Sequence, residues 1–245
     1  MHHAGSPIAL SVFVSAFAAT SACATTPGAR PTDMSASQHE AAAKGHDDEA
    51  APHAAAYDPK ASGAERSCGG ARSRVEDGPC WTSNANPTAG HLHDAEAHQK
   101  MAADHRAASK ALRDAEASAC GGVSEADRDE SPFVHREDIV SATKIEMTTT
   151  SGKSTTVRLV GATVVMRAVP GLTKEYLQRH LDCHLARNAA MGFVMSEMAF
   201  CPLSVKGVRV TVEGRGGAFA MEMRADETEA AREIFRRAQA LVPGA

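Results

Sequence analysis

The densest group of residues that could bind a metal or attack a substrate is the pentad His180-Leu181-Asp182-Cys183-His184. On a helix, His180 and His184 lie four residues apart on one face, a spacing that chelates a transition metal. Cys183 could add a thiolate, and three methionines follow as soft ligands for Cu(I), namely Met191, Met195 and Met198. The pentad therefore indicates a copper or zinc site made of His180, Cys183 and His184.

The same pentad has a structural interpretation, which we prefer and which needs no cofactor. His184 falls near the middle of an apolar helix face, where a histidine is usually a hydrogen-bonded core residue. Cys183 could pair with Cys201 in a disulfide that ties this helix to the next strand. A third interpretation makes Cys183 a nucleophile, but adjacent residues on a helix point in different directions. Since no hydrolase, P-loop or haem-attachment motif is complete, we expect no enzymatic activity.

A second set of histidines is dispersed over two segments, as His39, His46 and His53 and then His91, His93, His98 and His105. A step of seven residues rises about 10 Å along one helix, too far for successive imidazoles to share an ion. We expect these side chains to form a solubilising polar face. Weak, exchangeable metal binding is the alternative.

The N-terminus predicts export. Residues 8–19 form a short apolar run that fits the core of a signal peptide and is too short to span a membrane. Thr20-Ser21-Ala22-Cys23 then resembles a lipobox, which implies cleavage before Cys23 and a lipid anchor on that residue. The Ala24 that follows implies the outer membrane, facing the periplasm. Ala22-Cys23-Ala24 is also an A-x-A site, which would release a soluble periplasmic or secreted protein.

The segments between the leader and the last hundred residues are polar and rich in alanine. We predict a disordered tether over 23–64, because it has almost no large apolar side chain to bury. Residues 65–90 follow as a loop in which Cys68 and Cys80 could form a local disulfide. Good helix formers without proline predict a helical stalk over 91–119. If 68 pairs with 80 and 183 with 201, Cys120 has no partner in the chain.

The C-terminal region, residues 133–243, is patterned as a folded domain. Alternation around Val164 predicts a strand after a shorter one, and Thr173 caps a helix that carries Leu177, Leu181 and Leu185. Two strands around a Gly-rich turn and a last amphipathic helix complete the order. We therefore predict an α+β fold, a small two-layer sandwich with the order β-(β)-α-β-β-α.

Three stretches of this region resemble a group of uncharacterised bacterial cell-envelope lipoproteins. They are Cys120-Gly121-Gly122 before Ser131-Pro132-Phe133, the segment Asp182-Cys183-His184-Leu185-Ala186-Arg187, and Cys201-Pro202-Leu203. The resemblance covers roughly residues 91 to 243 and implies the cell envelope, but no activity.

The composition and the leader together suggest a role. A net charge of −4 gives no reason to expect a nucleic acid as partner. We expect a non-enzymatic, membrane-anchored lipoprotein whose C-terminal domain binds an envelope protein, with a copper- or zinc-binding protein as the alternative. The oligomeric state is not predicted.

Overall fold

The computed structural model describes residues 34–68, 80–194 and 198–244. The predicted signal peptide, Cys23 and Met195 lie outside these ranges. So do the side chains of Cys68 and Cys80, although the backbone of both is described. Within the described residues, no helix combines the length and apolarity needed to cross a membrane.

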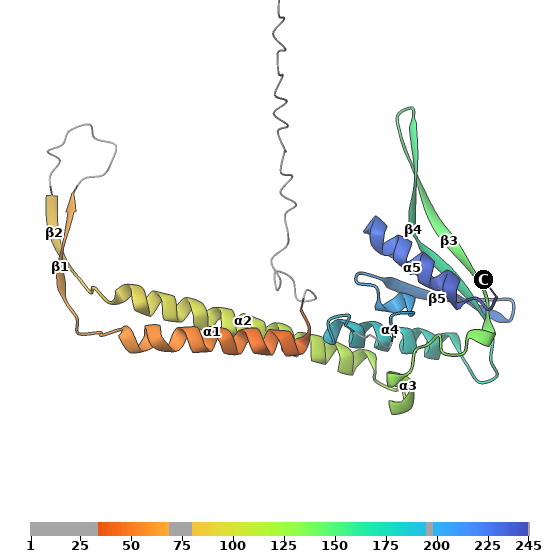
Figure 1. Ribbon diagram of the computed structural model, residues 1–245, viewed down its shortest axis with the longest axis horizontal. Coiled ribbons are helices and arrows are strands. Elements are labelled where there is room, and N and C mark those ends of the chain that lie inside the picture. The colour runs from red at the N-terminus through yellow and green to blue at the C-terminus, as the bar shows by residue number, and fades with distance from the viewer. Residues whose placement is uncertain (1–33, 69–79, 195–197, 245) are drawn as a thin grey trace, which may run out of the picture.

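The N-terminal half is a long antiparallel helical hairpin. Helix α1 (Ala36–Ala56) and helix α2 (Ala89–Ala119) lie side by side, and a small two-stranded sheet joins them at the far end (Figure 1). Ser35 begins α1 with a capping box, in which its hydroxyl accepts from the Gln38 backbone N–H. The disordered tether predicted over 23–64 is therefore wrong for the residues of α1, whereas the predicted stalk helix is confirmed.

Alanine explains why the hairpin forms without large apolar side chains. Each helix buries small residues at intervals of seven against the other helix, namely Ala36, Ala43 and Ala50 on α1 and Ala95, Ala102 and Ser109 on α2. Such small side chains let two helices approach closely, and alanine loses no rotamer entropy in a helix. The buried Ser109 hydroxyl donates a hydrogen bond of 3.0 Å to the Ala36 carbonyl across this interface.

The strands that close the hairpin are β1 (Gly63–Cys68) and β2 (Cys80–Ala85). They pair antiparallel, in a register that places Cys68 opposite Cys80. Because both side chains lie outside the described residues, the disulfide between them stays a prediction.

The C-terminal domain confirms the predicted element order. Strands β3 (Ile139–Ser151) and β4 (Ser154–Arg167) precede helix α4 (Lys174–Ala190), and strands β5 (Arg209–Arg215) and β6 (Ala218–Arg224) precede helix α5 (Thr228–Leu241). The strands form one antiparallel sheet in the order β3-β4-β6-β5. The chain therefore has the predicted α+β fold.

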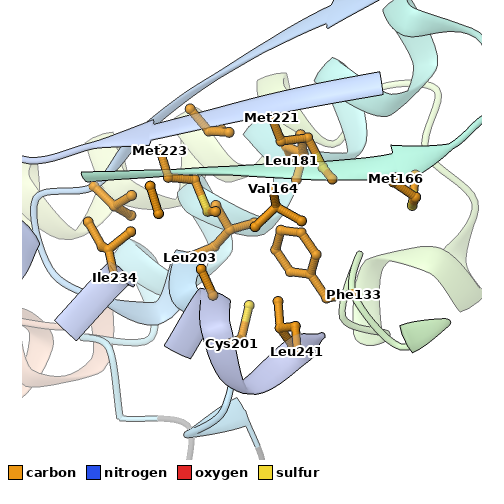
Figure 2. Close-up of a cluster of buried hydrophobic side chains, with 14 of the residues drawn as sticks. Phe133, Val164, Met166, Leu181, Cys201, Leu203, Met221, Met223, Ile234 and Leu241 are labelled. Carbon is orange, nitrogen blue, oxygen red and sulfur yellow. The ribbon is translucent and has the colours of Figure 1, made fainter. Parts of the chain in front are cut away.

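Both helices of this domain pack on one face of the sheet. Register places Ala142, Val164, Met221 and Val212 in one row across the four strands, all within the core cluster or packed against it. Leu181 of α4 and Ile234 of α5 belong to the same core (Figure 2). In the neighbouring row, Thr143, Thr163, Glu222 and Thr211 lie on the opposite, more polar face.

A disulfide joins the hairpin to the domain. Cys120, the residue that ends α2, is bonded to Cys183 of α4, with 4.5 Å between their Cα atoms. The predicted pair of Cys183 and Cys201 is therefore wrong, and Cys201 is a free, buried thiol. Cys183 pairs with Cys120 because α2 packs against α4. Arg187 of α4 also forms a 3.3 Å ion pair with Glu116 of α2.

Short elements connect the disulfide to the sheet. Helix α3 (Glu125–Asp129) and the 3-10 turn η1 (Arg136–Asp138) lie between α2 and β3, and the 3-10 turn η3 (Pro202–Ser204) precedes β5. Ser124 caps α3 by accepting from the Asp127 backbone N–H. Helix α3 and the turn η3 both contact α4, and the segment from α3 to η1 forms part of the cavity described below.

Candidate metal centre

The hairpin brings the dispersed histidines together in pairs. His39 of α1 lies opposite His105 of α2, with 2.9 Å between their Nδ1 atoms. His46 meets His98 at 3.4 Å and His53 meets His91 at 3.2 Å, again between Nδ1 atoms. Successive imidazoles of one helix are too far apart to share an ion, but here the partner of each imidazole comes from the other helix. We call these six side chains the histidine ladder.

The ladder is continuous along the hairpin. Successive rings alternate between the two helices, and their centroids are 5.2, 5.5, 5.7, 5.9 and 5.5 Å apart from His39 to His91. Each ladder histidine of α1 follows a buried alanine by three residues, for example His46 after Ala43. The alanine layers thus set a helix separation at which opposing imidazoles touch.

A carboxylate completes the middle rung. The Glu49 Oε2 atom lies 3.3 Å from His46 Nδ1 and 3.0 Å from His98 Nδ1. With metal–ligand bonds of roughly 2.0–2.1 Å, two ligand atoms of a tetrahedral zinc site are about 3.3 Å apart. The three atoms of this Glu49 cluster are 3.0 to 3.4 Å apart and therefore match one face of such a tetrahedron.

A second cluster lies one heptad further toward the strands. His53 Nδ1 is 3.2 Å from His91 Nδ1 and 3.7 Å from a carboxylate oxygen of Asp94. All three ligand atoms of this Asp94 cluster lie within 4.8 Å of one another. It is the more open of the two, since the His53 side chain is 33% exposed against 25% for His46.

The rung formed by His39 and His105 differs from the other two. His39 is buried, and the metal-capable groups found among the described residues do not include it or His105. Burial and the nearby charges of His39 and His46 lower the pKa of His105, which favours its neutral imidazole. This rung is suited to a hydrogen-bonded pair rather than to an ion.

Hydrogen bonding alone can also account for each rung. Two neutral imidazoles can share one N–H···N bond when one carries its proton on Nδ1 and the other on Nε2. One proton then lies between the two Nδ1 atoms of each pair. A metal ion would take the place of this proton and accept the lone pairs of both Nδ1 atoms. The Glu49 and Asp94 clusters differ from the rung of His39 and His105, because each adds a carboxylate, the third ligand that a hydrogen-bonded pair does not need.

The pentad in α4 does not assemble the predicted copper or zinc site. Cys183 is bonded to Cys120, so its sulfur is neither a thiolate ligand nor a nucleophile. His180 donates from Nε2 to the Asp127 carbonyl at 2.7 Å. His184 faces the other way, into the core, where its Nε2 lies 3.6 Å from the Cys201 sulfur.

The methionines do not restore a copper site. Met198 is buried in the core cluster and Met191 is 43% exposed, whereas Met195 lies outside the described residues. No group of three ligand atoms forms around the pentad among the residues that the structure describes.

The contact between Cys201 and His184 is buried and uncharged. Figure 2 shows Cys201 beside Leu203 and Leu241 in the core, and its exposed fraction is 0%. Burial raises the pKa of the Cys201 thiol and lowers the pKa of His184 to about 4. Neither shift favours a thiolate–imidazolium pair, and no substrate reaches the sulfur, so this pair has the character of core packing.

Comparisons with protein-family models, with curated protein sequences and with solved structures find no match for this chain. The geometry of the ladder is therefore the basis on which a function can be assigned. Sequence reasoning found its histidines but not their pairing. The signal for the pairing was the shared heptad, since each opposing pair of residue numbers adds up to the same total.

Proposed function

We propose that this chain is an exported protein that binds divalent transition-metal ions between α1 and α2. The observation that carries the proposal is the Glu49 cluster, in which two imidazole nitrogens and one carboxylate oxygen lie at the spacing of zinc ligands. The Asp94 cluster offers a second, more exposed site of the same composition.

The ligand types favour Zn²⁺ or Cu²⁺. Imidazole suits zinc and copper, whereas magnesium and calcium prefer oxygen ligands alone and Cu(I) prefers sulfur. Each cluster supplies three protein ligands and leaves further positions to water or another donor. The ligand side chains are also partly exposed. Both features suit an ion that is bound reversibly rather than a permanently enclosed structural metal.

The disulfide supports the export part of the proposal. Stable disulfides form in oxidising compartments, and the bond between Cys120 and Cys183 links two elements of the folded core. Together with the apolar leader, this bond favours an extracytoplasmic protein, anchored through a lipidated Cys23 in our preferred form. Release as a soluble periplasmic or secreted protein is the alternative. Intact mass spectrometry of the native protein distinguishes the two, because only the first carries acyl chains.

Metal titration of the mature chain tests the binding. We expect metal-free protein to bind up to two Zn²⁺ ions by calorimetry and elemental analysis. His98→Gln should remove the Glu49 site. His135→Gln is the matched control, because the His135 side chain is 71% exposed and lies outside the hairpin. Equal zinc binding by both variants, or none by the unmodified chain, would contradict the proposal.

A further inference from the structure

The C-terminal domain contains a cavity of about 220 Å³ that shares no residue with the histidine ladder. It lies between the segment from α3 to η1, the end of β4 and the first half of α4. Drug-sized ligands usually occupy cavities of roughly 300–1,000 Å³, so this one suits a smaller molecule.

The floor and walls of the cavity are apolar. Met166 and Leu177 are buried core residues at its base. Val134 and Val169 also line it, although their side chains are 43% and 39% exposed. Large apolar side chains exposed next to a cavity lose contact with water when a ligand covers them, which favours an occupant with an apolar body.

Three carboxylates and the imidazoles of His135 and His180 line the cavity. Asp127, Glu130 and Asp138 line it, and no lysine or arginine is among its lining residues. Asp138 also forms a 3.7 Å ion pair with Arg167, a residue that does not line the cavity. Carboxylates beside an apolar surface attract a cation, because a partly desolvated charge pair is stronger than one in water.

Two hydrogen bonds hold the polar wall in place. The Tyr176 hydroxyl donates to the Asp127 carboxylate, and this bond, with one from Ser124, keeps the pKa of Asp127 below its ordinary value. His180 donates from Nε2 to the Asp127 carbonyl. In the neutral imidazole, its Nδ1 is then an acceptor. The Tyr176 hydroxyl and the His180 Nε2–H are therefore already used as donors, and the carboxylate oxygens remain as acceptors for a ligand.

We propose that this cavity is a binding site for a small organic cation, a primary amine on a compact apolar body. The apolar floor takes the body, and the carboxylates of Glu130 and Asp138 take the ammonium group. The proposal does not depend on metal binding by the histidine ladder, because the two sites share no residue.

Two probes of similar size and opposite charge test the charge preference. Titration of the metal-free full chain with 2-phenylethylamine, followed by NMR and calorimetry, should show saturable binding that shifts the Tyr176 and His180 resonances. Phenylacetate has the same phenyl ring and the opposite charge, and it should bind at least tenfold more weakly. Equal binding of both probes, or no saturable binding of the amine, would overturn the proposal.

Two pairs of variants test the location. Asp138→Asn should weaken amine binding about tenfold, whereas Glu146→Gln on β3, outside the cavity, should leave it unchanged. Val169→Trp should fill the cavity and abolish binding. Val157→Trp is its matched control, because Val157 is 57% exposed and does not line the cavity. Amine binding that survives Val169→Trp in a folded variant would place the ligand elsewhere and overturn the proposal.

Discussion

His46 and His98 meet through their Nδ1 atoms at 3.4 Å, although 52 residues separate them in the chain. The contact exists only when α1 is docked on α2, because each helix contributes one of the two imidazoles. An ion bound there would therefore link the two helices directly. Metal binding and docking of α1 are expected to be coupled.

The first prediction follows from that coupling. Zinc at about 100 times its dissociation constant should stabilise the docked hairpin by about 2.7 kcal/mol, because the ion binds only the docked form. Hydrogen exchange of the α1 amides should slow by up to about a hundredfold, whereas amides of β5 and β6 should not change. If zinc binds with the expected stoichiometry but α1 exchange is unaffected, the coupling is absent and the metal site still stands.

The second prediction concerns the alanine layers. Ala102 is fully buried between α1 and α2. Ala102→Leu should therefore force the helices apart and cost about 1–3 kcal/mol of hairpin stability. The same change should weaken zinc binding, because the opposing imidazoles separate. Ala103→Leu is the matched control, since Ala103 is exposed on the same helix. Denaturant unfolding followed by circular dichroism measures both variants, and equal losses would contradict the role assigned to the layer.

The sheet could be predicted from the sequence because its signal is local. Val210 and Val212 alternate with polar residues, and this period of two identifies both a strand and its buried face. The helix α1 gives no such signal, since its buried residues are mostly alanines that hydropathy does not separate from a polar linker. Its stability depends on α2, a partner that only the tertiary structure supplies.

The site could be predicted only in part, for a related reason. A heptad of histidines on one helix places its members too far apart to share an ion, and that inference is correct for an isolated helix. Antiparallel pairing of His46 with His98 is a long-range fact, as is the bond between Cys120 and Cys183. Counting cysteines left the partner of Cys120 open, because spacing along the chain does not show that α2 packs against α4.

The third prediction tests the disulfide. Cys120 and Cys183 are 63 residues apart. In the chain-entropy model, a disulfide that closes a loop of this length lowers the entropy of the unfolded chain and so raises the free energy of unfolding by about 4 kcal/mol. The double variant Cys120→Ala with Cys183→Ala should lose stability of that order in denaturant titrations. Peptide mapping under non-reducing conditions provides the independent check. A fragment that joins 183 to 201 instead would contradict the observed pairing.

The fourth prediction uses the buried histidine of the core. Burial, followed by the nearby charges of His180 and Arg187, lowers the pKa of His184 from 6.5 to about 4 in the folded protein. Between these values the unfolded chain binds a proton that the folded chain does not, so the free energy of unfolding decreases as the pH falls from 6.5 to 4. The loss from this residue should approach about 3 kcal/mol at the lower end and vanish above pH 6.5.

The other histidines also titrate in this range, so the measurement compares two proteins. His184→Gln should be less stable at pH 7 because it disturbs the core, but its unfolding free energy should fall less steeply between pH 6.5 and 4. The Cys201 thiol contributes no slope in this window, since burial raises its pKa further above neutrality. Parallel pH dependence of the two proteins would mean that His184 is protonated in the fold, in conflict with its buried position beside an uncharged sulfur.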